Sequence, residues 1–430
     1  MRRLWSVLAS FALASALALA CAKDDEEPGA PRGDGGLDAA LIGETAPPDL
    51  DADVPLGDVC GDPGGLQPNA IWPLKGGCPK RAGYAGRGGP QNATIRWSAP
   101  IAAGESSPAI TADGTLWVGT AEGDVVAIAA TNGSVLSALR AGGGAVRSSP
   151  AIDVDGVAVI GGGDGLLYGV VLGAAPPVDA GADADAGEDA GVPAGRAVRK
   201  VNVDGPIASS PVIAKDGTAI VTTTNGKVVA VTAGGAVKWS VTVGGDGASS
   251  PVIGRDGRIY VGGANQLFAL EPGGGARDWT YDVGAIAGSP VVGGDDTIYV
   301  GASDGKLHAV APDGKARWTY AAGGPITGAP AVAGGVVYVG AADKKLHAIA
   351  TPDGKKKWEY ATLGDVATPL VTNDGNVYVA ASDGYLYALR PTGLLYFAAS
   401  LKGKAKGAPA LGDDGTLYVT TDTGIVAVGP

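Results

Sequence analysis

Histidine, the residue that most often serves as an acid–base catalyst or a metal ligand, is scarce in this sequence. His308 and His347 are its only histidines, and both occupy one place in a repeated pattern that other units fill with Val, Tyr or Phe. An imidazole at such a place is a packed, partly exposed structural residue far more often than a catalytic base or a metal ligand. We therefore expect both histidines to be structural.

Acidic residues suggest calcium ligands in two places. The segments 153–156 and 183–185 each hold two Asp one residue apart. Most Asp residues of the repeat region, residues 94–430 without the stretch 173–195, stand directly before Gly, which is the pairing that tight hairpin turns use. The second segment also lacks the terminal bidentate acid of a calcium loop. We therefore expect no calcium site, and no cluster has the spacing of a zinc or haem site.

The first of three cysteines follows an export signal. Arg2 and Arg3 precede an apolar run, residues 4–20, that is too short for a confident membrane span. Residues 18–21 resemble the lipobox of bacterial lipoproteins. We predict a lipoprotein signal peptide at 1–21 and lipidation of Cys21, which would anchor the protein to a membrane. The alternative is ordinary cleavage that leaves Cys21 unmodified.

The other two cysteines, Cys60 and Cys78, enclose a segment rich in Gly and Pro. An exported protein rarely keeps an odd free thiol, so lipidation of Cys21 would leave this pair to form a disulfide. On the chain-entropy model such a disulfide contributes about 3 kcal/mol. We predict a Cys60–Cys78 disulfide within a lead-in segment, residues 60–93.

The net charge of −12 is concentrated outside the main body of the chain. Residues 22–60 carry eleven acids and two bases, and residues 173–195 carry five acids, so the remaining chain is close to neutral. A neutral body offers no basic stripe for phosphates, which argues against nucleic acid as a partner. We expect a flexible acidic tether at 22–59 and a disordered insertion at 173–195.

Internal repeats fill the rest of the chain. A Pro preceded by Ser, Ala or Thr recurs at positions 108, 150, 211, 251, 290, 330, 369 and 409. Each unit contains four short apolar runs separated by tight turns, many of them Asp-Gly, which is typical of an antiparallel meander. Radial stacking of such sheets gives a β-propeller. We predict an all-β fold over 94–430 with eight four-stranded blades.

The ends of the repeat region predict how the ring closes. The eighth unit stops at residues 425–428 after three strands, and residues 94–97 form a spare strand ahead of the first unit. The amino-terminal strand should therefore complete the last blade. Its Trp97 matches the Trp that ends several units, where we expect an indole to wedge between blades.

Short motifs give the repeats a resemblance to a known family. Residues 338–340 (Tyr-Val-Gly), residues 387–389 (Tyr-Ala-Leu) and the Gly-x-x-x-Trp endings are similar to the repeats of the pyrroloquinoline-quinone (PQQ) family, and 72–83 resembles that family's lead-in. The resemblance covers 72–430. It implies the eight-bladed fold, but this family includes both quinone-dependent dehydrogenases and non-enzymatic lipoproteins of the outer-membrane barrel-assembly machinery.

A quinone-dependent dehydrogenase of this family would have an aromatic floor under the quinone, acidic calcium ligands and often two adjacent cysteines. This sequence has no adjacent cysteines, and its ring Trp residues all fall at repeat positions. We therefore expect no bound PQQ or calcium, and no catalytic, cofactor-binding or metal-binding residue.

Charged residues gather at one repeat position, three residues before each repeat Pro. Glu105, Arg147 and Lys406 are the charged members, and they belong to units 1, 2 and 8, which become neighbours when the ring closes. With Lys402 and Lys404 they form our candidate partner-binding patch at the mouth of the central channel. The alternative is a surface ion pair between Glu105 and Arg147 or Lys406, contributing about 0 to 1 kcal/mol.

Together these features predict an exported, lipid-anchored, monomeric propeller that binds an envelope protein or polymer without catalysis. The resemblance points to outer-membrane protein assembly, on the periplasmic or the surface side of the outer membrane. Two alternatives are a PQQ-dependent oxidoreductase and a surface-displayed structural module.

Overall fold

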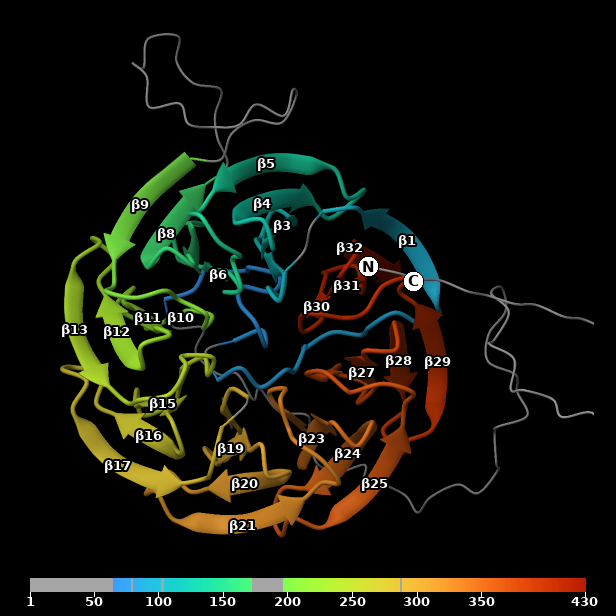
Figure 1. The fold of residues 1–430 in the computed structure, drawn as a ribbon. Helices are drawn as coiled ribbons and strands as arrows, with labels where there is room; N and C mark the ends of the chain where they lie inside the picture. The colour runs from blue at the N-terminus through green and yellow to red at the C-terminus, as the bar shows by residue number, and fades with distance from the viewer. Residues whose placement is uncertain (1–64, 79, 102–103, 172–195, 287) are drawn as a thin grey trace, which may run out of the picture. The chain divides into compact units, whose positions relative to one another are not determined.

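The computed structural model describes residues 65–78, 80–101, 104–171, 196–286 and 288–430. These residues all lie in one compact unit, Asp38–Pro430. They form eight four-stranded antiparallel sheets arranged as blades around a central axis (Figure 1). The predicted eight-bladed propeller is thus confirmed. Within the same ranges no helix is long and apolar enough to span a membrane.

The first four blades each run from a two-residue strand at the channel to a long strand at the rim. Blade 1 contains β2 (Ala109–Ile110), β3 (Thr115–Gly119), β4 (Asp124–Ala129) and β5 (Val135–Arg140); blade 2 contains β6 (Ala151–Ile152), β7 (Ala158–Gly161), β8 (Leu166–Val171) and β9 (Arg196–Asn202); blade 3 contains β10 (Val212–Ile213), β11 (Ala219–Thr222), β12 (Lys227–Val231) and β13 (Val237–Thr242); blade 4 contains β14 (Val252–Ile253), β15 (Ile259–Gly262), β16 (Gln266–Leu270) and β17 (Arg277–Asp282).

The last four blades repeat this order, except that blade 8 takes its rim strand from the other end of the chain. Blade 5 contains β18 (Val291–Val292), β19 (Ile298–Gly301), β20 (Lys306–Val310) and β21 (Ala316–Ala321); blade 6 contains β22 (Ala331–Ala333), β23 (Val336–Ala341), β24 (Lys345–Ala350) and β25 (Lys356–Ala361); blade 7 contains β26 (Leu370–Val371), β27 (Val377–Ala380), β28 (Tyr385–Leu389) and β29 (Leu395–Ser400); blade 8 contains β30 (Ala410–Leu411), β31 (Leu417–Thr421), β32 (Gly424–Gly429) and β1 (Thr94–Ala99).

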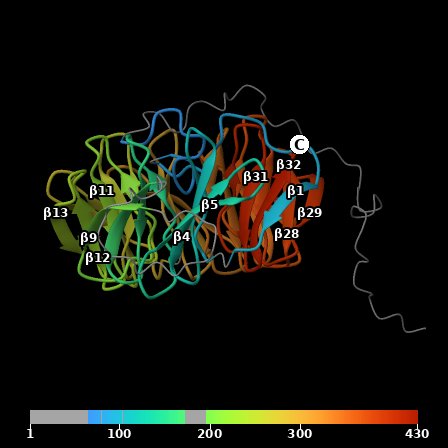
Figure 2. The same ribbon diagram turned by 90° about the horizontal axis from the view of Figure 1, so that it is seen from above.

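Strand β1 closes the ring as predicted. It pairs antiparallel with β32, from Thr94 opposite Gly429 to Ala99 opposite Ile425. Figure 2 shows β1 beside β32 at the rim. The first strand of the described chain is therefore joined to the last, and β1 covers the edge of β32 that would otherwise be unpaired.

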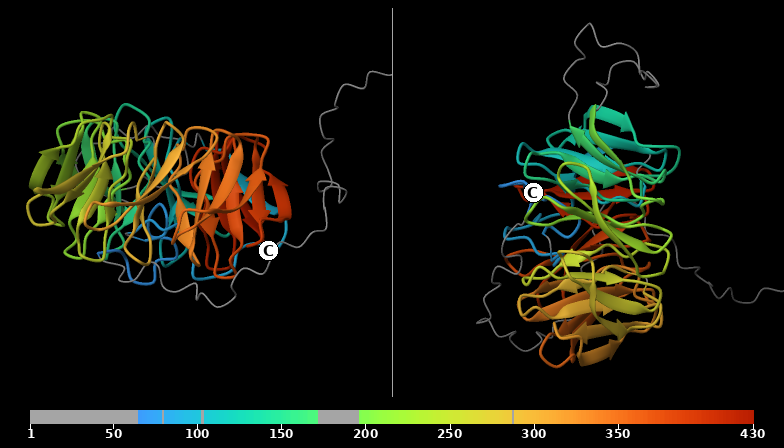
Figure 3. Two further views of the ribbon diagram at one scale, coloured as in Figure 1. Left: turned by 90° about the horizontal axis from the view of Figure 1, so that it is seen from below. Right: turned by 90° about the vertical axis from the view of Figure 1, so that its left-hand side faces the viewer.

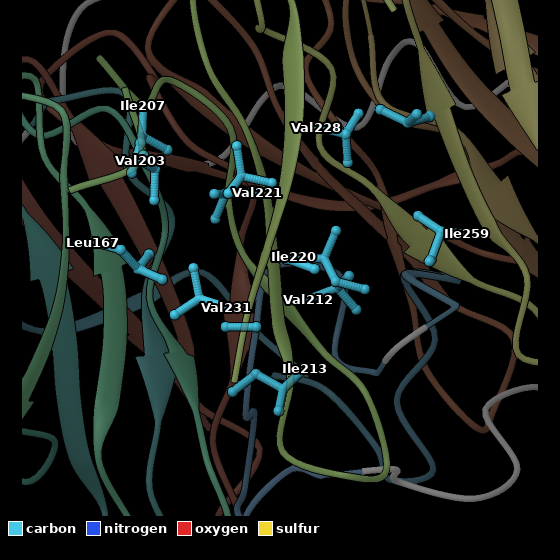
Figure 4. Close-up of a cluster of buried hydrophobic side chains, with 14 of the residues drawn as sticks. Leu167, Val203, Ile207, Val212, Ile213, Ile220, Val221, Val228, Val231 and Ile259 are labelled. Carbon is cyan, nitrogen blue, oxygen red and sulfur yellow. The ribbon is translucent and has the colours of Figure 1, made fainter. Parts of the chain in front are cut away.

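The core lies between neighbouring blades. The second and third strands are buried along nearly their whole length, so they are rich in Val, Ile, Leu and Ala, whereas rim strands such as β17 alternate exposed and half-buried residues. Figure 4 shows Val212 and Ile220 of blade 3 within one such cluster, with Ile259 of blade 4 beside them. Positive φ angles at the hairpins, 80° at Gly114 and 82° at Gly305, explain the repeated Asp-Gly pairs.

The described part of the lead-in segment, residues 65–78 and 80–93, lies across one face of the ring (Figure 3). Its backbone is hydrogen-bonded to the innermost strands of five blades: Ile110 N to Trp72 O (2.7 Å), Ile152 N to Pro73 O (2.8 Å), Val292 N to Lys80 O (3.0 Å), Val332 N to Ala82 O (2.8 Å) and Val371 N to Gly83 O (2.8 Å). The segment therefore closes one end of the central channel and ties distant blades together.

Candidate functional site

A belt of hydroxyl groups surrounds the channel at the residue before each repeat Pro. Backbone amides of one blade donate to hydroxyl oxygens of the next: Ser107 N to Ser149 Oγ (2.8 Å), Ser149 N to Ser210 Oγ (3.0 Å), Ser210 N to Ser250 Oγ (3.0 Å), Ser250 N to Ser289 Oγ (3.0 Å), Ala329 N to Thr368 Oγ1 (3.1 Å) and Ala408 N to Ser107 Oγ (2.8 Å). We call this ring the serine belt. Ala329 and Ala408 interrupt it because they carry no hydroxyl.

A cavity of about 300 Å³, here called the mouth cavity, opens beside the serine belt. Its lining is mostly Ala and Gly together with hydroxyl-bearing side chains. Four charged residues complete it: Lys75, Glu105, Arg147 and Lys406. The cavity therefore combines hydroxyl groups with an excess of positive charge.

The structure brings three of the five predicted patch residues to this cavity. Glu105, Arg147 and Lys406 all line it. The Glu105 carboxylate and the Arg147 guanidinium are 3.9 Å apart, and their side chains are 63% and 60% exposed. The surface ion pair that we weighed as the alternative is thus present, but in a loose and solvated form.

The other two predicted residues lie elsewhere. Lys402 adopts a positive φ of 54° and lines a separate pocket formed by β1, β32 and the end of β29. The backbone amide of Lys404 donates to the Asp422 carboxylate at 2.8 Å. The five residues therefore do not form a single cluster.

Lys75 is a residue of the cavity that the sequence did not single out. It comes from the lead-in segment, and no described residue forms a hydrogen bond or ion pair with its ammonium group. Burial, reinforced by the nearby Arg81 cation, lowers the pKa of Lys75 to about 8, while Glu105 acts in the opposite direction. Lys75 is thus a half-buried cation that lines the cavity.

Arg81 holds this part of the lead-in segment in place. The residue is only 2% exposed, and its guanidinium donates to four carbonyl oxygens: Pro251 O (2.9 Å), Lys75 O (3.1 Å), Ser210 O (2.8 Å) and Pro211 O (2.8 Å). Burial lowers the pKa of Arg81, but these acceptors favour the charged form, so Arg81 remains a cation at neutral pH. Arg81 therefore ties Lys75 to blades 3 and 4.

The two histidines are packed between blades, as expected, but they are more buried than we predicted. His308 is 7% exposed and His347 is 2% exposed. The His347 ring lies between the Tyr320 hydroxyl and the Asp343 carboxylate, 3.0 Å from each. Burial lowers the pKa of both imidazoles. Their rings contact the rim strand of the preceding blade, as in the Tyr281–His308 pair.

The rim Trp residues occupy the predicted positions between blades and also make a bond that we did not foresee. Each indole N–H donates to a carbonyl oxygen of the next blade: Trp97 to Ala130 (2.9 Å), Trp239 to Pro272 (3.1 Å), Trp279 to Pro312 (2.9 Å), Trp318 to Thr351 (2.7 Å) and Trp358 to Pro391 (2.8 Å). These indoles are therefore structural fasteners of the ring.

The mouth cavity does not fit a quinone cofactor. No aromatic side chain lines it to stack against a planar ring system, and Glu105 is its only carboxylate. The part of the chain that the structure describes also contains no group of three or more His, Cys, Asp or Glu that could hold a metal ion.

Of the predicted cysteine sites, only Cys78 falls among the described residues. Cys78 is 5% exposed and disulfide-bonded. Cys21 and Cys60 lie outside the described residues, as do the predicted signal peptide, the tether and the insertion at 173–195. Lipidation of Cys21 and the pairing of Cys78 with Cys60 therefore stay predictions.

A family model of PQQ repeats, described as outer membrane protein assembly factor BamB, matches residues 188–287 and 269–371. Among solved structures, BamB from Moraxella catarrhalis is similar, with 22% identity over 77% of this chain and 92% of that chain and a TM-score of 0.58. A quinohemoprotein alcohol dehydrogenase from Comamonas testosteroni has 15% identity over 83% and 80% of the two chains and a TM-score of 0.66. The computationally designed Ika8 protein has 13% identity over 78% and 99% and a TM-score of 0.63.

At these identities the structural matches establish the fold alone. No curated protein matches the sequence.

Proposed function

We propose that this eight-bladed propeller with PQQ-like repeats is a non-catalytic scaffold that binds another protein in the cell envelope. The match of residues 188–371 to the BamB family model carries this proposal. The lining of the mouth cavity supports it, because the charged residues there are suited to docking and do not form a catalytic arrangement.

The same proposal includes an outer-membrane location, with the mature chain anchored by a lipid on Cys21 and acting as a monomer. The signal layout of residues 1–21 supports the anchor. Replacing Cys21 by Ser should release the protein from the membrane fraction. Unchanged fractionation of the variant would argue against the anchor but not against partner binding.

The proposed docking face is the rim of the mouth cavity around Arg147 and Lys406. Both side chains are exposed, and they belong to blades 2 and 8, which flank blade 1 in an otherwise nearly neutral ring. Charges at such a rim mainly set the association rate and the choice of partner. The partner should therefore present an acidic surface.

Crosslinking in cells, followed by mass spectrometry of the captured proteins, tests this function. Capture of proteins that assemble outer-membrane barrels is the expected result. The double variant Arg147→Glu/Lys406→Glu should abolish capture and leave the melting temperature nearly unchanged. The matched control is Lys355→Glu/Lys357→Glu, which reverses two exposed charges of blade 6. If the first variant captures the same proteins as the wild type, the docking face is wrong.

A quinone-dependent oxidoreductase is the competing function, and the fold shared with the alcohol dehydrogenase is what favours it. Purified protein that carries a quinone and reduces a dye in the presence of an alcohol would replace our proposal. Protein that shows neither property, together with specific capture of an envelope partner, would support the scaffold.

A further inference from the structure

The charges around the mouth cavity do not balance. Lys75, Arg147 and Lys406 contribute three positive charges and Glu105 contributes one negative charge, so the lining has a net charge of +2 when Lys75 is protonated. Glu105 makes its one ion pair with Arg147, at 3.9 Å. Lys75 and Lys406 form none with any residue that the structure describes. A small dianion would neutralise this lining.

The serine belt adds hydrogen-bond donors to this charge. Ser210, Ser250, Ser289 and Thr368 line the cavity, and each hydroxyl oxygen already accepts a backbone N–H from the preceding blade. A hydroxyl has only one proton to donate. Within the described ranges none of these four hydroxyls has an acceptor for that proton. The belt is therefore prepared to donate to an oxyanion in the channel.

The position of the cations sets the shape of the ligand. Lys75 belongs to the lead-in segment, which closes one end of the channel, whereas Arg147 and Lys406 stand in exposed connections at the open end. The volume of about 300 Å³ equals the space of about ten water molecules at ~30 Å³ each. A short chain with an acidic group at each end would occupy it.

We propose that the mouth cavity binds a small organic dicarboxylate such as succinate. One carboxylate contacts Lys75 and the hydroxyls of the serine belt, and the other lies between Arg147 and Lys406. This site does not depend on the proposed protein partner. A chain that captures no envelope protein can still bind succinate, and a chain that docks a partner through its rim can lack the ligand.

Binding should depend on the protonation of Lys75. A carboxylate at its ammonium would raise the pKa of Lys75 from about 8, so the complex takes up protons near pH 8. The charged groups that act on Lys75 are Arg81, which disfavours its proton, and Glu105, which favours it, while Arg147 and Lys406 share the cavity. Affinity should fall as the pH rises above about 8.

Isothermal titration calorimetry of the mature protein with succinate tests the site. We expect saturable binding to the wild type and at least about a tenfold loss of affinity in Lys75→Met, because a hydrogen-bonded ion pair is removed. The matched control Lys402→Met removes a cation outside the cavity and should bind like the wild type. Absence of saturable heat in the wild type, or equal affinity in Lys75→Met, would overturn the proposal.

Two further measurements keep the test decisive. If Lys75→Met does not fold, Arg147→Met/Lys406→Met removes the other end of the site and should cause a similar loss. Inorganic phosphate serves as a compact anion that cannot reach both ends. Phosphate should bind at least about tenfold more weakly than succinate, and equal affinity would refute the two-point site.

Discussion

Two arcs of the ring differ in the residue that their rim strands place against the next blade. In the regular arc, blades 3 to 6, every rim strand carries a Trp whose indole bonds the next blade. In the charged arc, blades 8, 1 and 2, the corresponding residues are Trp97, Ser137 and Arg199. Ser137 and Arg199 have no indole, so the indole bond to the next blade is missing at these two junctions. Three of the four charged residues of the mouth cavity, Glu105, Arg147 and Lys406, come from these same three blades.

This contrast separates the part of the ring that has repeated indole bonds from the part that carries the charged cavity residues. The family model matches residues 188–371, which contain the whole regular arc. The repeated fasteners there leave little freedom for new side chains, because each packs against a neighbouring blade. In the charged arc the fastener is replaced at two junctions, and the lead-in segment, through Trp72 and Pro73, supplies backbone bonds to blades 1 and 2.

The largest effect on stability is expected when the segments that close the ring are deleted. Deleting residues 72–101 takes away β1 and most of the lead-in segment, so blade 8 exposes the edge of β32 and the channel loses its closed end. We expect loss of the cooperative unfolding transition, measured by circular dichroism. Deleting residues 173–195 should leave the melting temperature nearly unchanged. A stable ring after the first deletion would mean that the regular arc folds without the rest.

Arg81→Met tests how strongly the lead-in segment is bound. The substitution leaves four carbonyl acceptors without their buried cation, so we expect a loss of about 3 kcal/mol or more in the free energy of unfolding. Urea denaturation measures it. The control Arg255→Met removes an exposed arginine and should cost less than about 1 kcal/mol. Equal losses in the two variants would show that the segment contributes nothing special.

Trp318→Phe tests a single fastener of the regular arc. The variant loses the bond from the indole to the Thr351 carbonyl and part of the buried ring, which should cost about 1–2 kcal/mol. It should still fold, because Phe397 fills the same position in blade 7. Thermal denaturation provides the measurement. An unchanged melting temperature would show that the indole bond does not distinguish the two arcs.

The smallest effect concerns pH. Burial depresses the pKa of His308, so the unfolded chain binds its proton more readily than the folded chain, and stability should fall as the pH drops through about 6.5. His308→Phe copies Phe268 of blade 4 and removes a buried Nε2 that lacks a partner. In this variant the free energy of unfolding should decrease less between about pH 7 and pH 5, by roughly 1 kcal/mol or less compared with the wild type. An unchanged slope in denaturation curves would contradict this.

Local patterns were enough to predict the blades. Asp-Gly pairs mark the hairpins because they tolerate the φ that those turns require, and the spare strand at 94–97 predicted the closing pair. The Ser before a repeat Pro was also visible in the sequence. Its bond to the next blade was not, because that bond depends on how two sheets are stacked.

The lead-in segment escaped prediction for a different reason. Lys75 and Arg81 lie in a stretch without the alternation of a strand, so no pattern indicates which side chains turn inward. The predicted patch included Lys402, which lies outside the mouth cavity, because spacing along the chain does not reveal the positive φ of this residue. Residues placed by contacts across the ring are therefore the ones that sequence reasoning missed.

The pairing of β1 with β32 also determines when the ring can close as the chain is synthesised. Thr94 is made long before its partner Gly429, so β1 must wait until the eighth blade has been made before it can pair. Contacts of such long sequence separation form slowly. The serine belt has the same dependence, because Ser107 accepts its bond from Ala408. The mouth cavity is therefore complete only after residues 406–408 of the eighth unit have been made, and a copy that lacks this unit has no complete site.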